Sequence, residues 1–226
     1  RAAFVERIKA IGIDTLLVTV DGSVGANREH DRKNGFSLPL RYTPKLIAQV
    51  LAKPGWCLRV LAPQYLKRGV FRKANYPPEL ASKLTDKYID HEHTKSDSQN
   101  WDDIKRIRDM WPRTLIVKGV LHADDAVKCA EHGVDGVVIS NHGGIASDAA
   151  LAPIDVLPSV VRAVGDRMPV IVDSGFRRGS DILKGLALGA DAVIVGRATL
   201  YGVSAAGEPG ATRALEILQT ELRRTM

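Results

Sequence analysis

The sequence predicts an α/β fold and, within that class, a (β/α)8 TIM barrel. Five short runs rich in Val and Ile alternate with helical patterns. Near-continuous apolar runs of this kind are typical of parallel strands that are buried on both faces. Each run ends in a polar or charged residue, and a barrel places its chemistry at the carboxyl ends of its strands. A doubly wound open sheet is the alternative, with its function at one crevice.

The predicted elements follow one another at regular intervals. An opening helix is expected over residues 2–11, where apolar residues recur at helical spacing. The expected strands are 15–21, 114–118, 136–142, 169–173 and 192–197. Helical patterns cover residues 78–91, 101–110, 124–132, 154–164, 181–188 and about 211–224. The strand ends at 118, 142, 173 and 197 lie 24, 31 and 24 residues apart, which indicates βα repetition.

Composition narrows the class of protein. A chain of 226 residues, 45% of them apolar, is long enough to bury a sizeable core. Cys57 and Cys129 form no CxxC motif and no Cys/His cluster, which argues against a disulfide scaffold and against a metal site. No apolar run reaches the ~18 residues that a membrane-spanning helix needs. The chain opens at Arg1 inside an amphipathic pattern, and we expect it to belong to a longer protein.

One segment differs from the rest in charge. Residues 32–78 contain ten Lys and Arg residues and no Asp or Glu, with Trp56 and many Leu, Val and Tyr residues between them. This pattern favours an insertion that binds an anionic membrane surface, where each cation contributes about 1 kcal/mol. A solvated basic loop packed on its own protein is the alternative. Nucleic acid is a third possibility, and no recognition module supports it.

Three strand ends carry side chains suited to catalysis. Lys118 ends an apolar strand, so its cation is expected in the barrel mouth, where it would stabilise developing negative charge. A solvent-exposed lysine is the alternative. His142 precedes two glycines in a turn where backbone can approach a ligand, and it is the candidate general base. Asp21 ends another strand of the same face and would stabilise the imidazolium form of His142.

Two later loops indicate a phosphate-bearing ligand. The loops after the last two strands of a barrel often bind phosphate. Here they contain Gly175 with Arg177 and Gly196 with Arg197. Glycines free backbone N–H groups to face an anion, and arginines add charge-assisted hydrogen bonds. A phosphate-binding barrel without flavin, such as an isomerase or lyase, is compatible with these loops alone.

The order and content of these motifs resemble the FMN-dependent 2-hydroxy acid dehydrogenase and oxidase family. The shared runs are Lys118-Gly-Val, Ser140-Asn-His-Gly-Gly144, Asp173-Ser-Gly-Phe-Arg-Arg-Gly-Ser-Asp181 and Gly196-Arg-Ala-Thr-Leu-Tyr-Gly202. The resemblance implies that this chain covers about strands 4–8 of one FMN-binding barrel, with a basic insertion, residues 32–78, after strand 4. Segments 27–36 and 108–112 resemble the (S)-mandelate dehydrogenase branch, whose members bind membranes through an insertion at that place.

The resemblance also implies roles for individual residues. His142 would accept a substrate proton, Asp21 would stabilise its imidazolium form, and Arg28 would bind substrate. Lys118 would stabilise negative charge on the flavin ring. The remaining FMN contacts would come from Thr19 and Ser140 at the ring and ribityl region, Asp173 at the ribityl hydroxyls, and Gly175, Arg177, Gly196 and Arg197 at the phosphate.

The resemblance implies oxidation of a 2-hydroxy acid, (S)-mandelate-like or lactate, with electrons passed to a membrane quinone. It further implies a peripheral protein on the cytoplasmic face of the inner membrane and a homo-oligomer. One position departs from the family: Ile145 stands where its members have an arginine that binds the substrate carboxylate. Together with the absent N-terminal strands, this departure makes a catalytically impaired, membrane-associated relic the alternative function.

Overall fold

The computed structural model describes residues 2–22, 29–72, 82–86 and 99–226. The chain divides into two compact units. Unit 1 comprises residues 1–26 and 96–226, and unit 2 comprises residues 27–95.

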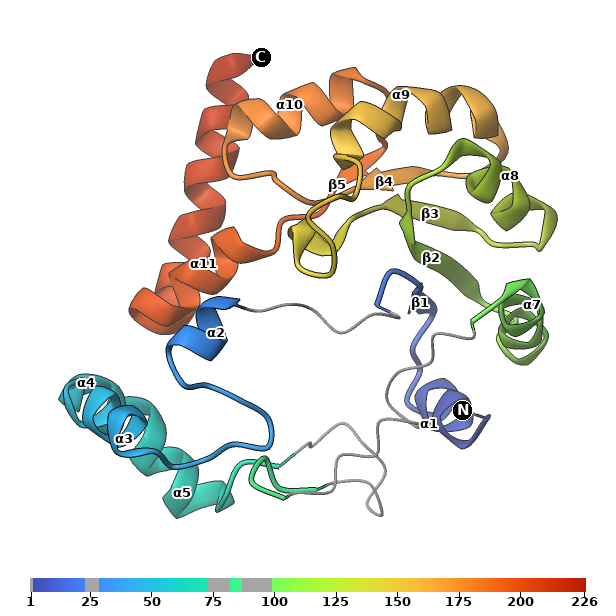
Figure 1. The fold of residues 1–226 in the computed structure, drawn as a ribbon. Helices are drawn as coiled ribbons and strands as arrows, with labels where there is room; N and C mark the ends of the chain where they lie inside the picture. Colours follow the sequence, from blue (N-terminus) through green and yellow to red (C-terminus); the bar gives the residue numbers. More distant parts are fainter. Residues whose placement is uncertain (1, 23–28, 73–81, 87–98) are drawn as a thin grey trace. The chain divides into compact units, whose positions relative to one another are not determined.

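Unit 1 is built on a five-stranded parallel sheet (Figure 1). Its strands are β1 (Thr15–Thr19), β2 (Thr114–Val120), β3 (Gly136–Ile139), β4 (Val170–Val172) and β5 (Ala192–Val193). They lie side by side in the order of the sequence, and every neighbouring pair is parallel. A doubly wound sheet would reverse direction at a switch point. The sequential order has no such reversal in the described strands, and it is the order in which a barrel is assembled.

Helices connect these strands and cover the sheet. They are α1 (Ala2–Ala10), α7 (Trp101–Met110), α8 (Ala123–Glu131), α9 (Pro153–Val164), α10 (Gly179–Ala187) and α11 (Arg197–Thr225). Helices α8, α9 and α10 contact the strands that flank them in sequence and follow one side of the sheet in Figure 1. Local chemistry sets where they begin: Asn100 and Asp103 form a reciprocal capping box at α7, which satisfies two otherwise unpaired backbone N–H groups.

The core lies between the sheet and these helices. Val137 and Ile139 of β3 and Leu157 of α9 are fully buried. Trp111 is also fully buried, and its indole N–H donates to the carbonyl of Thr114 at 2.8 Å. Burial of each such side chain contributes about 1.5–3 kcal/mol. This packing holds the strands of unit 1 in register and so fixes the positions of the loops that follow them.

Two helix predictions differ from the structure. The pattern over 78–91 predicts a helix, but residues 82–86, the part of it that the structure describes, form an isolated bridge and a turn. The backbone of this segment is paired with distant residues instead: Leu84 N–H donates to the carbonyl of Phe71 at 3.1 Å, and the Leu84 carbonyl accepts from Leu40 N–H at 2.7 Å. The final helix begins at Arg197, well before residue 211, and is interrupted by non-helical backbone at Ala206 and Gly207.

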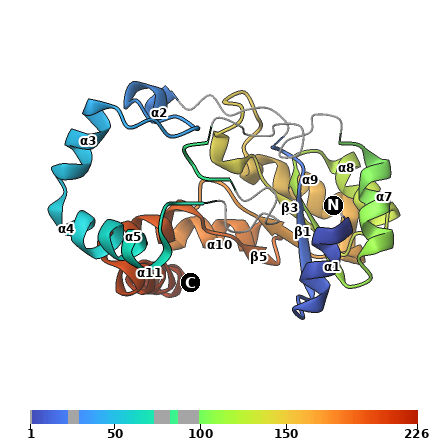
Figure 2. The same ribbon diagram turned by 90° about the horizontal axis from the view of Figure 1, so that it is seen from below.

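Unit 2 consists of short helices joined end to end. They are α2 (Glu29–Lys33), α3 (Pro44–Leu51), α4 (Pro54–Trp56), a π-helical turn (Cys57–Leu61) and α5 (Ala62–Arg68). Figure 2 shows α3, α4 and α5 as successive segments. Thr43 caps α3 by accepting from the N–H of Leu46, and Pro44 occupies the first helical turn, where its missing N–H costs nothing. No helix in the described ranges is long and apolar enough to cross a bilayer.

The described helices of unit 2 bury none of their residues. Large apolar side chains between residues 36 and 70 are exposed instead. These are Phe36, Leu38, Tyr42, Ile47, Leu51, Trp56, Leu58, Val60, Tyr65, Leu66 and Val70. Leu66 is 87% exposed and Leu58 72% exposed.

Candidate active site

The candidate base lies on a tightly folded loop that follows β3. His142 has a left-handed backbone with φ of 57°, and Gly143 and Gly144 continue it at 70° and 75°. The N–H of His142 donates to the buried Ser140 hydroxyl at 3.1 Å, and Asn141 caps the turn by accepting from Gly144 N–H. Positive φ is rare outside glycine, and its cost is tolerated where the surroundings fix the chain. The loop thus presents the imidazole in one orientation.

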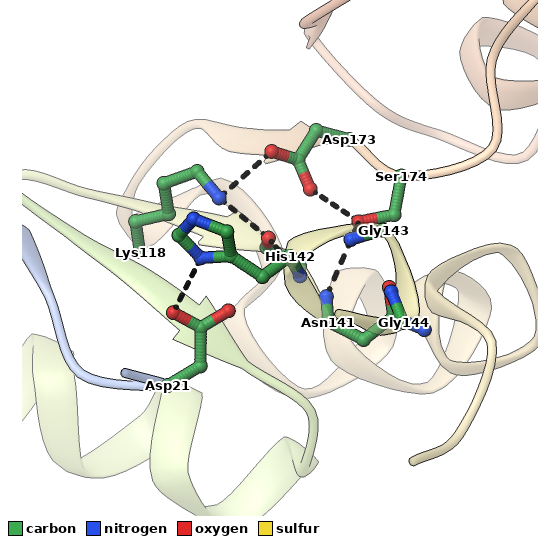
Figure 3. Close-up of polar contacts among 9 residues, drawn as sticks. Asp21, Lys118, Asn141, His142, Gly143, Gly144, Asp173 and Ser174 are labelled. Carbon is green, nitrogen blue, oxygen red and sulfur yellow. Dashed lines mark hydrogen bonds and ion pairs between the residues drawn. The ribbon is translucent and has the colours of Figure 1, made fainter. Parts of the chain in front are cut away.

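His142 is paired with a carboxylate from another strand. Its Nδ1 atom lies 3.1 Å from Oδ1 of Asp21, which follows β1 (Figure 3). The Asp21 side chain is 12% exposed and that of His142 is 47% exposed. A carboxylate only accepts hydrogen bonds, so this contact places the imidazole proton on Nδ1 and leaves the Nε2 lone pair free. The second Asp21 oxygen, Oδ2, is buried and has no hydrogen-bond partner among the residues that the structure describes.

Lys118 lies in a second polar cluster, at the end of β2. Its Nζ atom lies 2.8 Å from Oδ2 of Asp173 and 2.6 Å from the Ser140 hydroxyl. Both charged side chains are largely buried, at 14% and 13% exposed. Ions that are this desolvated persist only when they are paired and hydrogen-bonded. The cluster therefore holds a positive charge in a fixed position beside the His142 loop.

These groups surround one cavity of about 460 Å³ in unit 1. Lys118, His142 and Asp173 line its polar wall, and Arg177 and Arg197 add two cations. The apolar wall consists of Ile145, Phe176, Ile194 and Leu200. A cavity of this size with a few convergent polar groups is the usual form of a small-molecule site.

The cavity is suited to a phosphate-bearing, polyhydroxylated ligand. At Gly175 and Gly196 an added Cβ would meet no atom within 4 Å, so backbone is open to the space that they border. The guanidinium groups of Arg177 and Arg197 supply charge-assisted bonds to an anion there. Asp173 lines the same cavity and accepts hydroxyl protons. Charge, hydrogen-bonding groups and open backbone all fit FMN.

Most of the predicted site residues gather at this cavity. Seven line it: Lys118, His142, Asp173, Gly175, Arg177, Gly196 and Arg197. Asp21 and Ser140 contact them through the hydrogen bonds described above. Thr19 pairs in register with Lys118 across β1 and β2, but it is exposed and not part of the cavity lining. Arg28 lies outside the described residues.

Sequence reasoning missed Ser174, which contacts both loops of the site. In the sequence, Ser174 has no evident role between Asp173 and Gly175, because its backbone φ of 72° cannot be predicted from the residue types. Sequence reasoning also missed the apolar wall, since Phe176 and Ile194 belong to runs that look like ordinary core. In the described ranges, no cluster of three or more His, Cys, Asp or Glu side chains could hold a metal ion.

Comparison with known proteins identifies the family. Residues 1–226 match the FMN-dependent dehydrogenase family. The chain belongs to this family. It is 41% identical to (S)-mandelate dehydrogenase of Pseudomonas putida over 215 residues, covering 95% of this chain and 53% of that protein. It is 40% identical to L-lactate dehydrogenase of Caulobacter vibrioides (strain NA1000 / CB15N) over 226 residues, covering 97% of this chain and 57% of that protein.

Solved structures agree with the family assignment. The crystal structure of the monotopic membrane protein (S)-mandelate dehydrogenase superposes with a TM-score of 0.87 at 40% identity, covering 99% of this chain and 58% of that one. A mandelate oxidase structure with (S)-mandelic acid gives a TM-score of 0.72 at 28% identity. The chain spans about half the length of the curated relatives that it matches. Its five sequential strands thus form part of the (β/α)8 barrel of the FMN-dependent dehydrogenases.

Proposed function

We propose that this protein oxidises a 2-hydroxy acid to the 2-keto acid with FMN as its cofactor. The observation that carries the proposal is the pairing of His142 with Asp21 at the cavity that Lys118 and Asp173 also line. Oxidation of a 2-hydroxy acid removes two protons and two electrons, and a base for one proton and a fixed cation beside the electron acceptor assist this reaction. The family membership and the named relatives support the same reaction class.

His142 acts on the substrate proton. Nε2 accepts it, and the imidazolium that forms is stabilised by Asp21 at 3.1 Å, a carboxylate that is already desolvated and oriented. FMN, when bound, would accept the two electrons together with the second proton.

Other residues of the cavity hold the cofactor. Lys118 provides a positive charge for the flavin ring, and Asp173 provides a carboxylate for the ribityl hydroxyls. Gly175, Arg177, Gly196 and Arg197 bind the phosphate through backbone N–H groups and guanidinium forks. Ser140 supports Lys118 at 2.6 Å, and Thr19 contributes from the adjacent strand.

An (S)-mandelate-like acid is the first candidate substrate and lactate the second, with Arg28 and His142 as the substrate contacts. The relatives that carry the names mandelate dehydrogenase and L-lactate dehydrogenase support this choice. We also propose peripheral attachment to the cytoplasmic face of the inner membrane, a quinone as electron acceptor, and a homo-oligomer. The exposed apolar side chains of unit 2, set among basic residues, support attachment to an anionic surface.

Replacement of His142 tests the proposed reaction. In His142→Asn we expect FMN to remain bound while its reduction by substrate slows by roughly a hundred- to ten-thousand-fold, because proton acceptance is lost. Stopped-flow absorbance follows the reduction, and the flavin spectrum reports cofactor content. His132→Asn is the matched control, since His132 stacks on Trp101 away from the cavity. Near-normal reduction in His142→Asn contradicts this assignment, and a colourless purified protein contradicts the flavin.

A second candidate function is a catalytically impaired relic of the family. Ile145 lines the cavity and favours this candidate, because an apolar side chain offers no charge-assisted fork to a carboxylate. The two functions differ in one measurement. A relic binds FMN and shows no reduction with any 2-hydroxy acid at saturating concentration, whereas the proposed enzyme is reduced by at least one of them.

A further inference from the structure

Ser174 occupies the junction between the two loops that carry the active-site groups (Figure 3). Its hydroxyl donates to Oδ1 of Asp173 at 2.8 Å. The same oxygen accepts the backbone N–H of Gly143 at 3.0 Å and that of Asn141 at 3.3 Å. A serine hydroxyl has one donor and two acceptor positions, so all three are used here.

The backbone of Ser174 is in the left-handed region, with φ of 72°. A residue other than glycine is destabilised by this conformation, and it adopts it only where surrounding contacts hold it in place. Glycine would adopt this backbone without that cost. The three hydrogen bonds of the hydroxyl are the contacts that offset it, which indicates that the hydroxyl is needed at this point.

The two accepted N–H groups flank the candidate base. Asn141 and Gly143 are its neighbours in sequence, and the N–H groups of both donate hydrogen bonds to the Ser174 hydroxyl oxygen. This arrangement fixes the Ser140–Asn141 and His142–Gly143 peptide planes and so holds the loop in which His142 has its left-handed backbone at φ of 57°. The imidazole direction toward Asp21 follows from that backbone.

We propose that Ser174 is a positioning residue whose hydroxyl holds the His142 loop against the Asp173 loop and thereby keeps the imidazole on Asp21. The inference rests on the proposed function, in which His142 takes the substrate proton. The inference adds to that function a structural link between the proposed cofactor-binding residues and the base His142. Lys118, Asp173, Ser174 and the His142 loop form one continuous series of hydrogen bonds.

Two variants separate the hydroxyl from the backbone. Ser174→Gly removes the hydroxyl and also the cost of positive φ, so it is expected to fold. Ser174→Ala removes the hydroxyl and keeps the Cβ. Ser159→Ala is the matched control, because Ser159 on α9 donates to the carbonyl of Val156 within its own helix, and neither residue lines the cavity.

Solution NMR of the whole chain gives a readout that needs no substrate. In both Ser174 variants the Asn141 and Gly143 amides should exchange with solvent roughly tenfold faster, the size expected for one lost hydrogen bond. The ¹⁵N shifts of the His142 ring should change from the single Nδ1–H tautomer to a mixture. A role in folding alone would leave the tautomer unchanged. Ser159→Ala should match the unmodified chain in both measurements.

The outcomes divide clearly. Protected amides and one tautomer in both variants overturn the proposal. Loss in Ser174→Ala with normal behaviour in Ser174→Gly also overturns it, because backbone strain would then be the cause. Loss in both variants supports it, even if the unmodified protein oxidises no hydroxy acid; that last result contradicts the proposed function alone.

Discussion

At the scale of single residues, Ile145 bears on how the proposed substrate carboxylate would be held. It is 39% exposed and lines the cavity that His142 also lines. The resemblance places an arginine at this position, and an aliphatic side chain provides neither its charge nor its two parallel donors. If Arg28 alone binds the carboxylate, the site works with one cationic fork instead of two.

Restoring the arginine is the direct test of this residue. A hydrogen bond to a charged group contributes about 1.5–3 kcal/mol, and a bidentate arginine makes two, so Ile145→Arg should raise kcat/KM for a 2-hydroxy acid by roughly two to four orders of magnitude. Affinity for FMN should hardly change, because the phosphate loops contain Arg177 and Arg197, not residue 145. Steady-state kinetics and flavin titration measure the two quantities. Ile145→Met, which is apolar and flexible, is the matched control and should give no gain.

No gain from Ile145→Arg would contradict the missing-fork explanation. It would leave two accounts of the site: Arg28 already satisfies the carboxylate, or the substrate has no carboxylate there. Inhibition by oxalate compared with neutral analogues separates them, since only the first account predicts tighter binding of the dianion.

Cys129 is a buried thiol that the proposed chemistry does not use. It is fully buried in α8, and desolvation, assisted by the nearby charge of Asp125, raises its pKa from an ordinary 9.0 to about 12. A neutral buried thiol is inert, because the thiolate is the reactive form. Cys57 is only partly buried, and its thiol donates to the carbonyl of Val50 at 3.1 Å.

The raised pKa predicts a defined loss of stability in alkali. Unfolded Cys129 ionises near pH 9 and folded Cys129 near 12, so its contribution is complete below pH 9 and is lost as pH rises from 9 to 12. Between pH 8 and pH 10 the unfolding free energy should therefore fall by about 1.4 kcal/mol more than in Cys129→Ala. Urea unfolding at both values measures this. Equal falls in the two proteins would show that the thiol ionises similarly in both states.

At the scale of elements, a bulge in β2 sets the spacing of the site. The pairing of β2 with β3 shifts register between Lys118 and Val120, and Gly119 between them has φ of 107°. A Cβ on Gly119 would lie 2.7–2.8 Å from three atoms of Asp21, one of them its backbone nitrogen. The missing side chain makes room for the carboxylate that orients His142. Bulges are common next to active sites for this reason.

Gly119→Ala should therefore separate Asp21 from His142. Because the clash involves backbone, Asp21 must move, and we expect flavin reduction to slow by roughly ten- to a hundred-fold, as small misplacements of catalytic groups do. The positive φ adds a loss of stability of about 1–3 kcal/mol. Stopped-flow reduction and thermal unfolding measure the two effects. Gly22→Ala is the matched control, since its Cβ would meet nothing within 4 Å; equal behaviour of the two variants would contradict the spacing role.

The sequence predicts a helix or strand well when residues close in sequence determine it, and poorly when contacts with distant residues do. All five strands were predicted because their runs are nearly all apolar, although only Gly136–Ile139 is fully buried and the strands Thr15–Thr19 and Ala192–Val193 contain no buried residue. The helix over 78–91 was wrong at 82–86 because the backbone of Leu84 bonds to that of Leu40 and Phe71, contacts distant in sequence that leave no local signal. The early start of α11 was missed because Gly202 and Gly210 pack backbone against backbone, a tertiary contact without a local signal.

At the scale of the whole molecule, the site could be predicted because its residues follow strands. Parallel strands end at one edge, so polar residues far apart in sequence, such as Asp21 and His142, meet there. The Lys118–Asp173 pair also follows from this rule. What could not be predicted depends on loop conformation: the three bonds of Ser174, and the bulge that admits Asp21. The contacts of Ser174 and the bulge at Gly119 both depend on positive φ values, which cannot be predicted from the residue types alone.

The same scale includes unit 2, whose surface differs from that of unit 1. Its described helices leave their apolar side chains exposed, while the segment carries ten cations and no acid between residues 32 and 78. Apolar side chains gain about 1.5–3 kcal/mol each on full burial, and cations near anionic lipid add about 1 kcal/mol each. These two contributions together are enough for reversible attachment to an anionic bilayer without a spanning helix.

Changes in three exposed leucines test this attachment. Leu51, Leu58 and Leu66 are 69%, 72% and 87% exposed, so replacing all three with serine should leave unit 2 folded while removing several kcal/mol of membrane burial. We expect binding to phosphatidylglycerol vesicles to weaken by at least roughly a hundred-fold, as measured by co-sedimentation at low salt. Ile11→Ser with Leu151→Ser, at 69% and 60% exposed in unit 1, is the matched control. High salt should weaken the unmodified protein's binding by screening its cations. If the triple variant binds vesicles as the control does, the leucines of unit 2 do not enter the bilayer and the membrane proposal fails.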